Sequence, residues 1–216
     1  MSNDREKQLA AQAAAVLVKD GMRVGLGTGS TVAFLLPALA SRRLSIRCVA
    51  TSDETLRVAG ELGLQVEQAD TLDELDIAID GADQVTPDGW LIKGGGGAHT
   101  REKVVAASAA RFIVIVDSTK PVPALHPPVP LELLTFGLPA TLRRLGRVTL
   151  RDVPPSPDGG VIADYHGDIS DPAELAARLA GTPGVIGHGL FEPALVSAVI
   201  VGRGDQVETR RLTASP

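Results

Sequence analysis

Short apolar runs, often β-branched, alternate with helix-like patterns over the first 120 residues of the chain. The expected strands are 22–26, 46–50, 74–79 and 112–116, and the expected helices are 3–18, 32–39, 54–62 and 99–110. Strands that are apolar along their length and separated by helices are typical of a parallel sheet covered on both faces. The alternation predicts an α/β domain with a doubly wound, mostly parallel (Rossmann-like) sheet.

The pattern changes after Lys120, where PVPALHPPVP holds five prolines in ten residues. Such a segment cannot sustain a helix or a central strand, so we place a domain crossing here. Beyond it, strands are expected at 131–136, 147–153 and 161–165, and a helix from Asp171-Pro172 to just before Gly181. Residues 198–201 and 206–212 are expected to return to the first sheet. These observations predict a Rossmann-like domain of residues 1–125 and 198–216, with a smaller α+β (ferredoxin-like) lobe, 126–197, inserted near the C-terminus.

Charge and composition exclude several classes of function. The chain has 21 Lys+Arg against 26 Asp+Glu, a formal net charge of −5, and only 3 % aromatic residues. It therefore lacks the basic field and the stacking platforms of nucleic-acid-binding proteins. A single cysteine, Cys48, forms no internal disulfide and fits a reducing compartment. The polar start and the short apolar runs predict a cytoplasmic protein without a membrane span. The four histidines lie at no spacing typical of a metal site.

The first motif is GLGTGST, residues 25–31, between an expected strand and an expected helix. Glycines there let the backbone turn tightly and bring its N–H groups close to a ligand, and the helix N-terminus favours an anion. The motif is neither a Walker A loop nor a dinucleotide fingerprint. A plain structural turn is the alternative to a cradle for phosphate or carboxylate.

The second motif is Asp80-Gly81-Ala82-Asp83, at the carboxyl end of the expected strand 74–79. Ligands of open α/β sheets bind outside the carboxyl ends of the strands. Two carboxylates three residues apart can serve as acid and base, hold sugar hydroxyls or bind a metal. The alternative is a turn in which aspartate accepts local backbone hydrogen bonds.

The third and strongest motif runs from Lys93 through four consecutive glycines to Glu102. Four glycines are entropically costly to order, which favours close approach of this backbone to another group. Glu102 is either a favourable partner of the helix dipole or a general base beside Lys93 and the glycine N–H groups, which would stabilise an oxyanion. Lys120, after the strand 112–116, either meets an anion or is a surface lysine.

Together these segments resemble ribose-5-phosphate isomerase, type A. The resemblance runs through GLGTGST, TSDET (51–55), DGAD (80–83), LIKGGGGAHTREK (91–103), the VDSTK segment ending at Lys120 and PGVIGHGLF near the C-terminus. It implies an aldose–ketose isomerase of the non-oxidative pentose phosphate pathway, which interconverts D-ribose 5-phosphate and D-ribulose 5-phosphate. It also implies that the enzyme needs neither metal nor organic cofactor and forms a homodimer or homotetramer.

The resemblance also implies roles for individual residues. Glu102 would move a proton between C1 and C2 through an enediolate. Asp80 and Asp83 would hold hydroxyls and assist ring opening, and Lys93 with the glycine amides would stabilise the oxyanion. Thr28–Thr31, Lys120 and Lys7 would serve mainly the phosphate end. The implied substrate-binding residues are Thr28, Gly29, Ser30, Thr31, Asp80, Gly81, Ala82, Asp83, Lys93, Gly94, Gly95, Gly96, Lys120 and Lys7.

The sequence departs from the family pattern at two places. His99 stands where an apolar residue is common, and RDVPPSPDGG (151–160) lacks the Thr-Asp-Asn-Gly-Asn pattern of the small lobe. A sensor and other enzymes of related fold are the alternatives to the isomerase. A non-catalytic sugar-phosphate sensor shares similar loops, but too few residues precede Met22 for a helix-turn-helix, and Glu102 with Lys93 would be superfluous in it. An amino-sugar-phosphate deaminase or CoA transferase would need a further catalytic motif. We therefore favour the isomerase.

Overall fold

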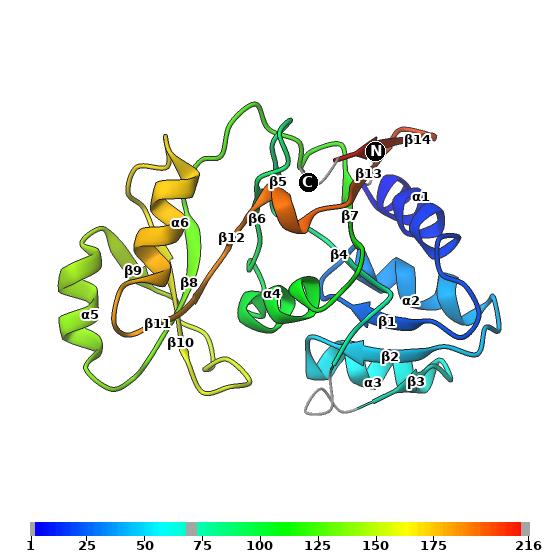
Figure 1. Cartoon of the computed structure of the whole chain (residues 1–216), viewed down its shortest axis with the longest axis horizontal. Coiled ribbons are helices and arrows are strands. Elements are labelled where there is room, and N and C mark those ends of the chain that lie inside the picture. Colours follow the sequence, from blue (N-terminus) through cyan, green and yellow to red (C-terminus); the bar gives the residue numbers. More distant parts are fainter. Residues whose placement is uncertain (1–2, 68–72, 213–216) are drawn as a thin grey trace. The chain divides into compact units, whose positions relative to one another are not determined.

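The computed structural model describes residues 3–67 and 73–212 (Figure 1). By its contacts the chain divides into two compact units. The first unit comprises Met1–Ala82, Arg101–Lys120 and Pro193–Pro216, and the second comprises Asp83–Thr100 and Pro121–Glu192. Residues 83–100 thus belong to the second unit by contacts, whereas the sequence led us to expect one uninterrupted domain up to residue 125. Among the described residues, we find no helix with the length and apolarity needed to cross a bilayer.

The first unit is built on a sheet with the strand order β14-β13-β7-β4-β1-β2-β3. Its strands are β1 (Arg23–Leu26), β2 (Arg47–Ala50), β3 (Gln65–Val66), β4 (Ile77–Asp80), β7 (Phe112–Asp117), β13 (Ala198–Arg203) and β14 (Gln206–Arg211). All neighbours pair in parallel except the edge hairpin β13–β14. The expected mostly parallel sheet and the return of the C-terminal strands to it are confirmed.

The order of these strands creates a switch point. From β1 the chain steps outward to β2 and β3, and it then resumes at β4 on the other side of β1. In open α/β sheets, a crevice forms at the carboxyl ends of the two strands where the direction of winding changes. The loops that follow β1 and β4 carry the first two motifs, so the topology places those motifs side by side.

Helices cover both faces of this sheet. They are α1 (Asp4–Ala15), α2 (Val32–Ala40), α3 (Asp53–Glu61) and α4 (His99–Ala107). Val24 and Leu26 of β1 point into a core shared with α1 and α2. Gly25, between them, faces the opposite way, and a Cβ added there would lie 2.5 Å from Val105 of α4. The glycine is needed at this point because α4 packs directly on the strand.

The first helix ends at Ala15, three residues earlier than its apolar pattern predicts. The N–H groups of residues 17 and 18 instead donate to the carbonyls three residues earlier, those of Ala14 and Ala15, as in a 3₁₀ turn. The guanidinium of Arg42 donates to the carbonyls of Ala15 and Val18, the latter at 2.7 Å. A cation on the last carbonyls satisfies groups that a helix end leaves unpaired, which stabilises this early stop.

The second unit contains a four-stranded antiparallel sheet with the order β11-β8-β10-β9. Its elements follow one another as β8 (Val129–Leu133), α5 (Leu138–Leu145), β9 (Val148–Leu150), β10 (Val161–Tyr165), α6 (Pro172–Ala180) and β11 (Val185–His188). This is the βαββαβ order of a ferredoxin-like fold, and the fold class predicted for the small lobe is confirmed. Asp171 caps α6 as expected, because its side chain accepts the N–H of Glu174 at 2.9 Å.

The structure corrects the sequence analysis at four points in this unit. Pro130 lies inside β8, an inner strand, although we expected the proline-rich segment to exclude one. Pro130 lies opposite Gly189, just past the end of β11, and its carbonyl accepts the Gly189 N–H at 2.7 Å. The Gly189 carbonyl accepts the Lys93 N–H at 2.9 Å, so it keeps a donor although Pro130 has no N–H. The helix α5 and the strand β11 were not expected. Nor was a small sheet of β12 (Leu190–Phe191), β6 (Leu91–Ile92) and β5 (Gln84–Val85).

Candidate active site

The loop after β1 turns sharply against the end of β4. The Gly27 N–H donates to the carbonyl of Ile79 at 3.0 Å. A Cβ added at Gly27 would lie 1.9 Å from the carboxyl group of Asp80, so no other residue type fits without a rearrangement. Gly29 adopts a φ of +110°, a conformation that favours glycine. Sequence positions 25–31 therefore form a close-packed turn, with Gly29 and Ser30 exposed at its tip.

Asp80 holds this turn through its carboxylate. The side chain is 3 % exposed, and Oδ1 accepts the N–H groups of Thr28 at 3.1 Å and Gly81 at 2.7 Å. Two backbone donors compensate for the desolvation of a buried negative charge. The structure thus brings Thr28, Asp80 and Gly81 together as the sequence led us to expect, and Gly81 and Ala82 follow half-buried.

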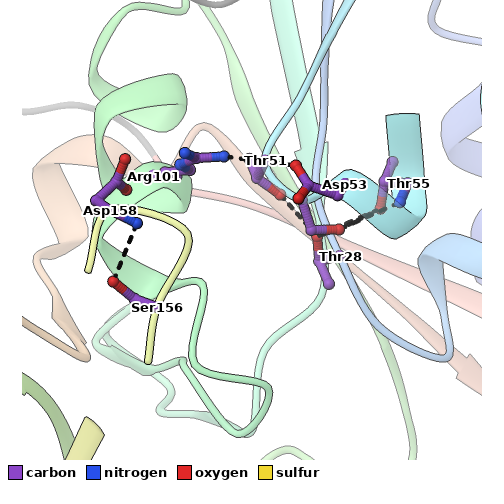
Figure 2. Close-up of polar contacts among 8 residues, drawn as sticks. Thr28, Thr51, Asp53, Thr55, Arg101, Ser156 and Asp158 are labelled. Carbon is purple, nitrogen blue, oxygen red and sulfur yellow. Dashed lines mark hydrogen bonds and ion pairs between the residues drawn. The ribbon is translucent and has the colours of Figure 1, made fainter. Parts of the chain in front are cut away.

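A cluster of hydroxyl groups surrounds Thr28 (Figure 2). The Thr28 hydroxyl lies 2.8 Å from that of Thr51, donates to Ser52 at 2.8 Å and lies 3.3 Å from the hydroxyl of Thr55. Thr55 in turn donates to the carbonyl of Gly27 at 2.9 Å. The TSDET segment (51–55) therefore packs against the first motif and fixes the position of Thr28.

A pocket of about 210 Å³ opens beside the tip of the loop. It is lined by Gly29, Ser30, Val32, Ala33, Leu36, Glu54, Thr55 and Val58. Ser30 is exposed there, and Thr31, 8 % exposed, precedes the first residue of α2. A helix start with adjacent hydroxyl groups suits an anion, although Glu54 at the rim opposes it.

Lys7 and Lys120, the two lysines expected at the phosphate end, lie on two segments that are linked by hydrogen bonds to the Glu6 carboxylate. Lys7 is in α1, next to Glu6, and Lys120 follows β7. Glu6 accepts the N–H of Ser118 at 2.9 Å and that of Gly204 at 2.7 Å. These hydrogen bonds, led by the one from Gly204, lower the pKa of Glu6 to about 2. Glu6 therefore ties the loop of Lys120 to the helix of Lys7.

The glycine loop, residues 94–97, lies in the second unit. Gly94 and Gly97 have φ values of +106° and +78°, and the Gly97 N–H donates back to the Gly94 carbonyl at 3.0 Å. The Gly95 N–H donates to Oδ2 of Asp83 at 2.8 Å. Asp83 is exposed and supports the loop through this bond, a role that the sequence analysis did not give it.

Two buried side chains flank this loop. Lys93 is 3 % exposed, and its ammonium lies 5.5 Å from the centre of the Phe191 ring, within the range of a cation–π interaction. His99 is fully buried, and a Cβ added at Gly94 would lie 2.7 Å from its Nδ1. His99, the residue that departs from the family pattern, therefore occupies the space into which a side chain at position 94 would point.

Arg151 also contacts the glycine loop, and the sequence analysis missed it. Its Nη1 donates to the carbonyls of Gly94 at 2.9 Å and Gly95 at 3.0 Å. Its Nε and Nη2 donate to the carboxylate of Asp164 on β10 at 2.8 and 2.7 Å. These bonds to Asp164 raise the pKa of the Arg151 guanidinium. No residue-type signal marks such a contact, because its acceptors are backbone carbonyls.

The segment after Arg151, which departs from the family pattern, folds onto a buried carboxylate. Glu132 of β8 is 1 % exposed and accepts the hydroxyl of Ser156. That hydroxyl also accepts the N–H groups of Asp158 at 3.2 Å (Figure 2) and Gly160 at 2.9 Å. A Cβ at Gly160 would lie 2.3 Å from the Glu132 carboxylate, so the turn is built around this pair.

Glu102 lies in the first turn of α4, the helix that follows the glycine loop along the chain. It is 6 % exposed, unlike most glutamates of surface helices. The preceding residue, Arg101, lies 3.9 Å from Asp53 at the start of α3 (Figure 2). A nearly buried carboxylate in the first helical turn suits either a dipole partner or a proton-transferring base.

In the part of the chain that the structure describes, no three His, Cys, Asp or Glu side chains gather in a way that would hold a metal ion. Taken unit by unit, the polar groups described above are carboxylates, hydroxyls, backbone N–H groups and lysines. These groups suit a ligand that is both polyhydroxylated and anionic.

Comparison with known proteins defines the class. Residues 47–206 match the family described as ribose 5-phosphate isomerase A (phosphoriboisomerase A). Ribose-5-phosphate isomerase A of Roseiflexus castenholzii is 44 % identical, over 96 % of this chain and 96 % of that protein. The structure of ribose 5-phosphate isomerase A from Methanocaldococcus jannaschii is 35 % identical, with a TM-score of 0.90 over 97 % of this chain and 100 % of that one. A D-ribose-5-phosphate isomerase solved in complex with phospho-erythronic acid is 34 % identical, with a TM-score of 0.91 over 98 % and 100 %.

These matches and the fold place the chain among the sugar-phosphate isomerases. It belongs to the ribose 5-phosphate isomerase A family, and it is an enzyme.

Proposed function

We propose that the chain interconverts D-ribose 5-phosphate and D-ribulose 5-phosphate through an enediolate, with Glu102 as the proton-transferring base. Family membership supports the substrate and the reaction. The observation that carries the assignment of the base is the burial of Glu102, 6 % exposed, in the first turn of the helix after the glycine loop. A desolvated carboxylate interacts strongly with charge that develops next to it.

In the proposed reaction, Glu102 removes the proton from C2 of the open-chain aldose. The electron pair of that C–H bond forms the C1–C2 double bond, and the carbonyl oxygen at C1 becomes the enediolate oxygen. A proton then passes from the oxygen on C2 to the oxygen on C1. Protonated Glu102 returns its proton to C1, which leaves the ketone at C2 and restores the carboxylate.

Lys93 and the N–H groups of Gly94 and Gly96 are the proposed donors to the enediolate oxygen, because the Gly95 N–H already donates to Asp83 at 2.8 Å. Lys93 is 3 % exposed, and the loop is held by side chains on both its N–H and its carbonyl groups. Donors fixed before the reaction stabilise the transition state without a reorganisation cost. Asp80 and Asp83 are proposed to hold sugar hydroxyls and to assist ring opening.

The proposed phosphate end consists of Thr28–Thr31, Lys120 and Lys7. The exposed loop tip beside a helix start and the tie from Glu6 to the loop of Lys120 support this assignment. The related isomerase solved with phospho-erythronic acid, a ligand named for a phosphate and an acid group, agrees with a site for a doubly anionic molecule. Binding the phosphate away from the reacting carbons would orient the substrate.

The direct test is turnover. Purified protein is mixed with ribose 5-phosphate in EDTA, and formation of the ketose is followed. We expect turnover under these conditions. No ketose at all would favour the alternative of a sugar-phosphate sensor, and turnover only after addition of a metal would refute a reaction without one.

The base is tested with Glu102→Gln. We expect this variant to lose exchange of the C2 proton with solvent deuterium while it still binds substrate, because the amide cannot accept that proton. Glu61→Gln is the matched control, since Glu61 is an exposed helix glutamate paired with Arg57 at 2.6 Å. Exchange at the wild-type rate in Glu102→Gln would remove Glu102 from its role.

The phosphate end is tested with Lys120→Ala, against Lys19→Ala as an exposed control. We expect Lys120→Ala to raise KM with little change in kcat, as uniform binding predicts. A fall in kcat at unchanged KM would assign Lys120 to the chemistry.

We also propose that the enzyme is a cytoplasmic homodimer or homotetramer. Light scattering at micromolar concentration tests the state of assembly.

A further inference from the structure

Arg151 contacts the glycine loop from the side opposite to Asp83. Asp83 accepts the N–H of Gly95, whereas Arg151 donates to the carbonyls of Gly94 and Gly95. The guanidinium is itself held in place, because its other edge makes a bidentate pair with Asp164, at 2.7 and 2.8 Å. The Arg151 and Asp164 side chains are only 18 % and 17 % exposed. Four hydrogen bonds from one guanidinium therefore connect the strand β10 to the glycine loop.

The two carbonyls decide where the neighbouring N–H groups point. In a planar trans peptide, the N–H points away from the carbonyl of the same peptide unit. The Gly94 carbonyl shares its unit with the Gly95 N–H, and the Gly95 carbonyl shares its unit with the Gly96 N–H. By fixing both carbonyls, Arg151 directs both N–H groups away from the guanidinium.

The charge of Arg151 also affects the strength of these donors. A cation at a carbonyl oxygen polarises the peptide unit, and hydrogen bonds that share a unit strengthen one another. The Gly94 carbonyl additionally accepts the Gly97 N–H at 3.0 Å, which closes the turn. Polarised, oriented N–H groups are what an oxyanion needs from its surroundings.

The glycines of this loop need an external contact to hold them in one conformation. Four consecutive glycines have a large conformational entropy to lose, and two of them here adopt positive φ values. An external clamp lowers the cost of ordering during the reaction, because the ordering is completed when the protein folds. A lysine at this position would keep the charge but not the planar fork that bonds Asp164 and two carbonyls at once.

The Gly95 N–H is taken by Asp83, which leaves the Gly96 N–H as the donor that this arrangement presents to a ligand. We propose that Arg151, held by Asp164, is a positioning residue that orients the glycine loop so that the Gly96 N–H faces the enediolate oxygen. This inference rests on the proposed function of that loop. Arg151 acts on the reaction through Gly94 and Gly95.

The test compares Arg151→Ala and Arg151→Lys with Arg178→Ala. Arg178 is a matched control in the same unit, because it donates to the Tyr165 hydroxyl at 2.7 Å and lies over the same ring. Two quantities are measured on the purified proteins: kcat and KM for ribose 5-phosphate in EDTA, and deuterium uptake by the peptide that spans residues 93–99.

For both Arg151 variants we expect kcat to fall by about 10²-fold, the cost of a small misplacement of catalytic groups, with a much smaller change in KM. Deuterium uptake in residues 93–99 should rise in parallel. Guanidinium chloride at non-denaturing concentration should restore part of the kcat of Arg151→Ala in a saturable way, whereas sodium chloride should not. Arg178→Ala should keep the wild-type kcat and loop protection.

Three results would overturn the proposal. They are a kcat close to wild type in Arg151→Ala, a fall in kcat without faster exchange in the loop, and a folded Arg151→Ala variant that saturating guanidinium does not rescue. If the wild-type protein fails to isomerise ribose 5-phosphate, the proposed function is wrong. The deuterium uptake then still decides whether Arg151 holds the loop.

Discussion

Replacing Gly27 by alanine adds a single carbon at the most crowded point of the first loop. That carbon would lie 1.9 Å from Cγ and Oδ1 of Asp80 and 2.5 Å from its Cβ. Asp80 is 3 % exposed and has no nearby solvent to move into, so its carboxylate must leave the Thr28 and Gly81 N–H groups. The substitution therefore acts by displacing a buried charge from its donors.

The magnitude follows from the bonds that are lost. A hydrogen bond to a charged group contributes about 1.5–3 kcal/mol, and overpacking alone costs about 1–3 kcal/mol. Partial relaxation of the loop recovers some of this energy, so we expect a loss of about 3 kcal/mol in the free energy of unfolding. For a protein of this length, such a loss lowers Tm by about 6–12 °C. Activity should fall as well, because Asp80 is a proposed substrate ligand.

Gly60→Ala is the matched control for this experiment. Gly60 is exposed in α3, and a Cβ there would meet nothing within 4 Å. Alanine favours a helix over glycine by about 0.5–1 kcal/mol, so this variant should be slightly more stable than wild type. Urea unfolding followed by circular dichroism measures both changes. Surface substitutions usually change the free energy of unfolding by less than about 0.5 kcal/mol. A Gly27→Ala protein whose free energy of unfolding lies within that limit of wild type would refute the argument.

Two further predictions use titrating groups of the same unit. The pKa of Glu6 is lowered to about 2 from an ordinary 4.5, so its stabilising bonds are fully present above pH 4.5 and are lost as the pH falls toward 2. Glu6→Gln should therefore be less stable than wild type at neutral pH, and urea unfolding should show this difference shrinking below pH 4.5; a constant difference would contradict the assignment. Burial and the nearby charge of Glu67 raise the pKa of the Cys48 thiol to about 12. At pH 8 a thiol reagent should label Cys48 only after unfolding in urea, and rapid labelling of the native protein would show that the strand β2 opens.

Elements of the parallel sheet were predictable because each carries a strong local signal. The strands β1, β2, β4 and β7 are apolar except for an arginine at the start of β1 and β2 and an aspartate at the end of β4 and β7, and the motifs that follow them lie where the chain leaves the sheet. Asp80 was found for this reason, since a polar residue that ends an apolar strand is conspicuous. The helix α5 had comparable signals, with Gly137 at its start, Pro139 in its first turn and Gly146 at its end. We missed it because it is only eight residues long and follows directly on a strand that was expected to reach residue 136.

The support of the glycine loop was beyond sequence reasoning for a different reason. Arg151 binds carbonyl groups, which every residue possesses, and it does so from a position more than fifty residues further along the chain. Asp164, which holds Arg151, reads in the sequence as an ordinary polar residue of an alternating strand. Only the pairing of β9 and β10 brings the two side chains together.

The alternation of the chain between its two units has a consequence for how the protein is made. The strand β7 is an inner strand of the first sheet, but its partner β13 comes from beyond the second unit, with Ile113 pairing with Ala198. During synthesis, β7 therefore waits with one edge open until the second unit has left the ribosome. Unpaired strand edges of apolar sequence are sites of association between chains. We expect chains that stop before residue 198 to aggregate through β7, so the last two strands protect the sheet as well as complete it.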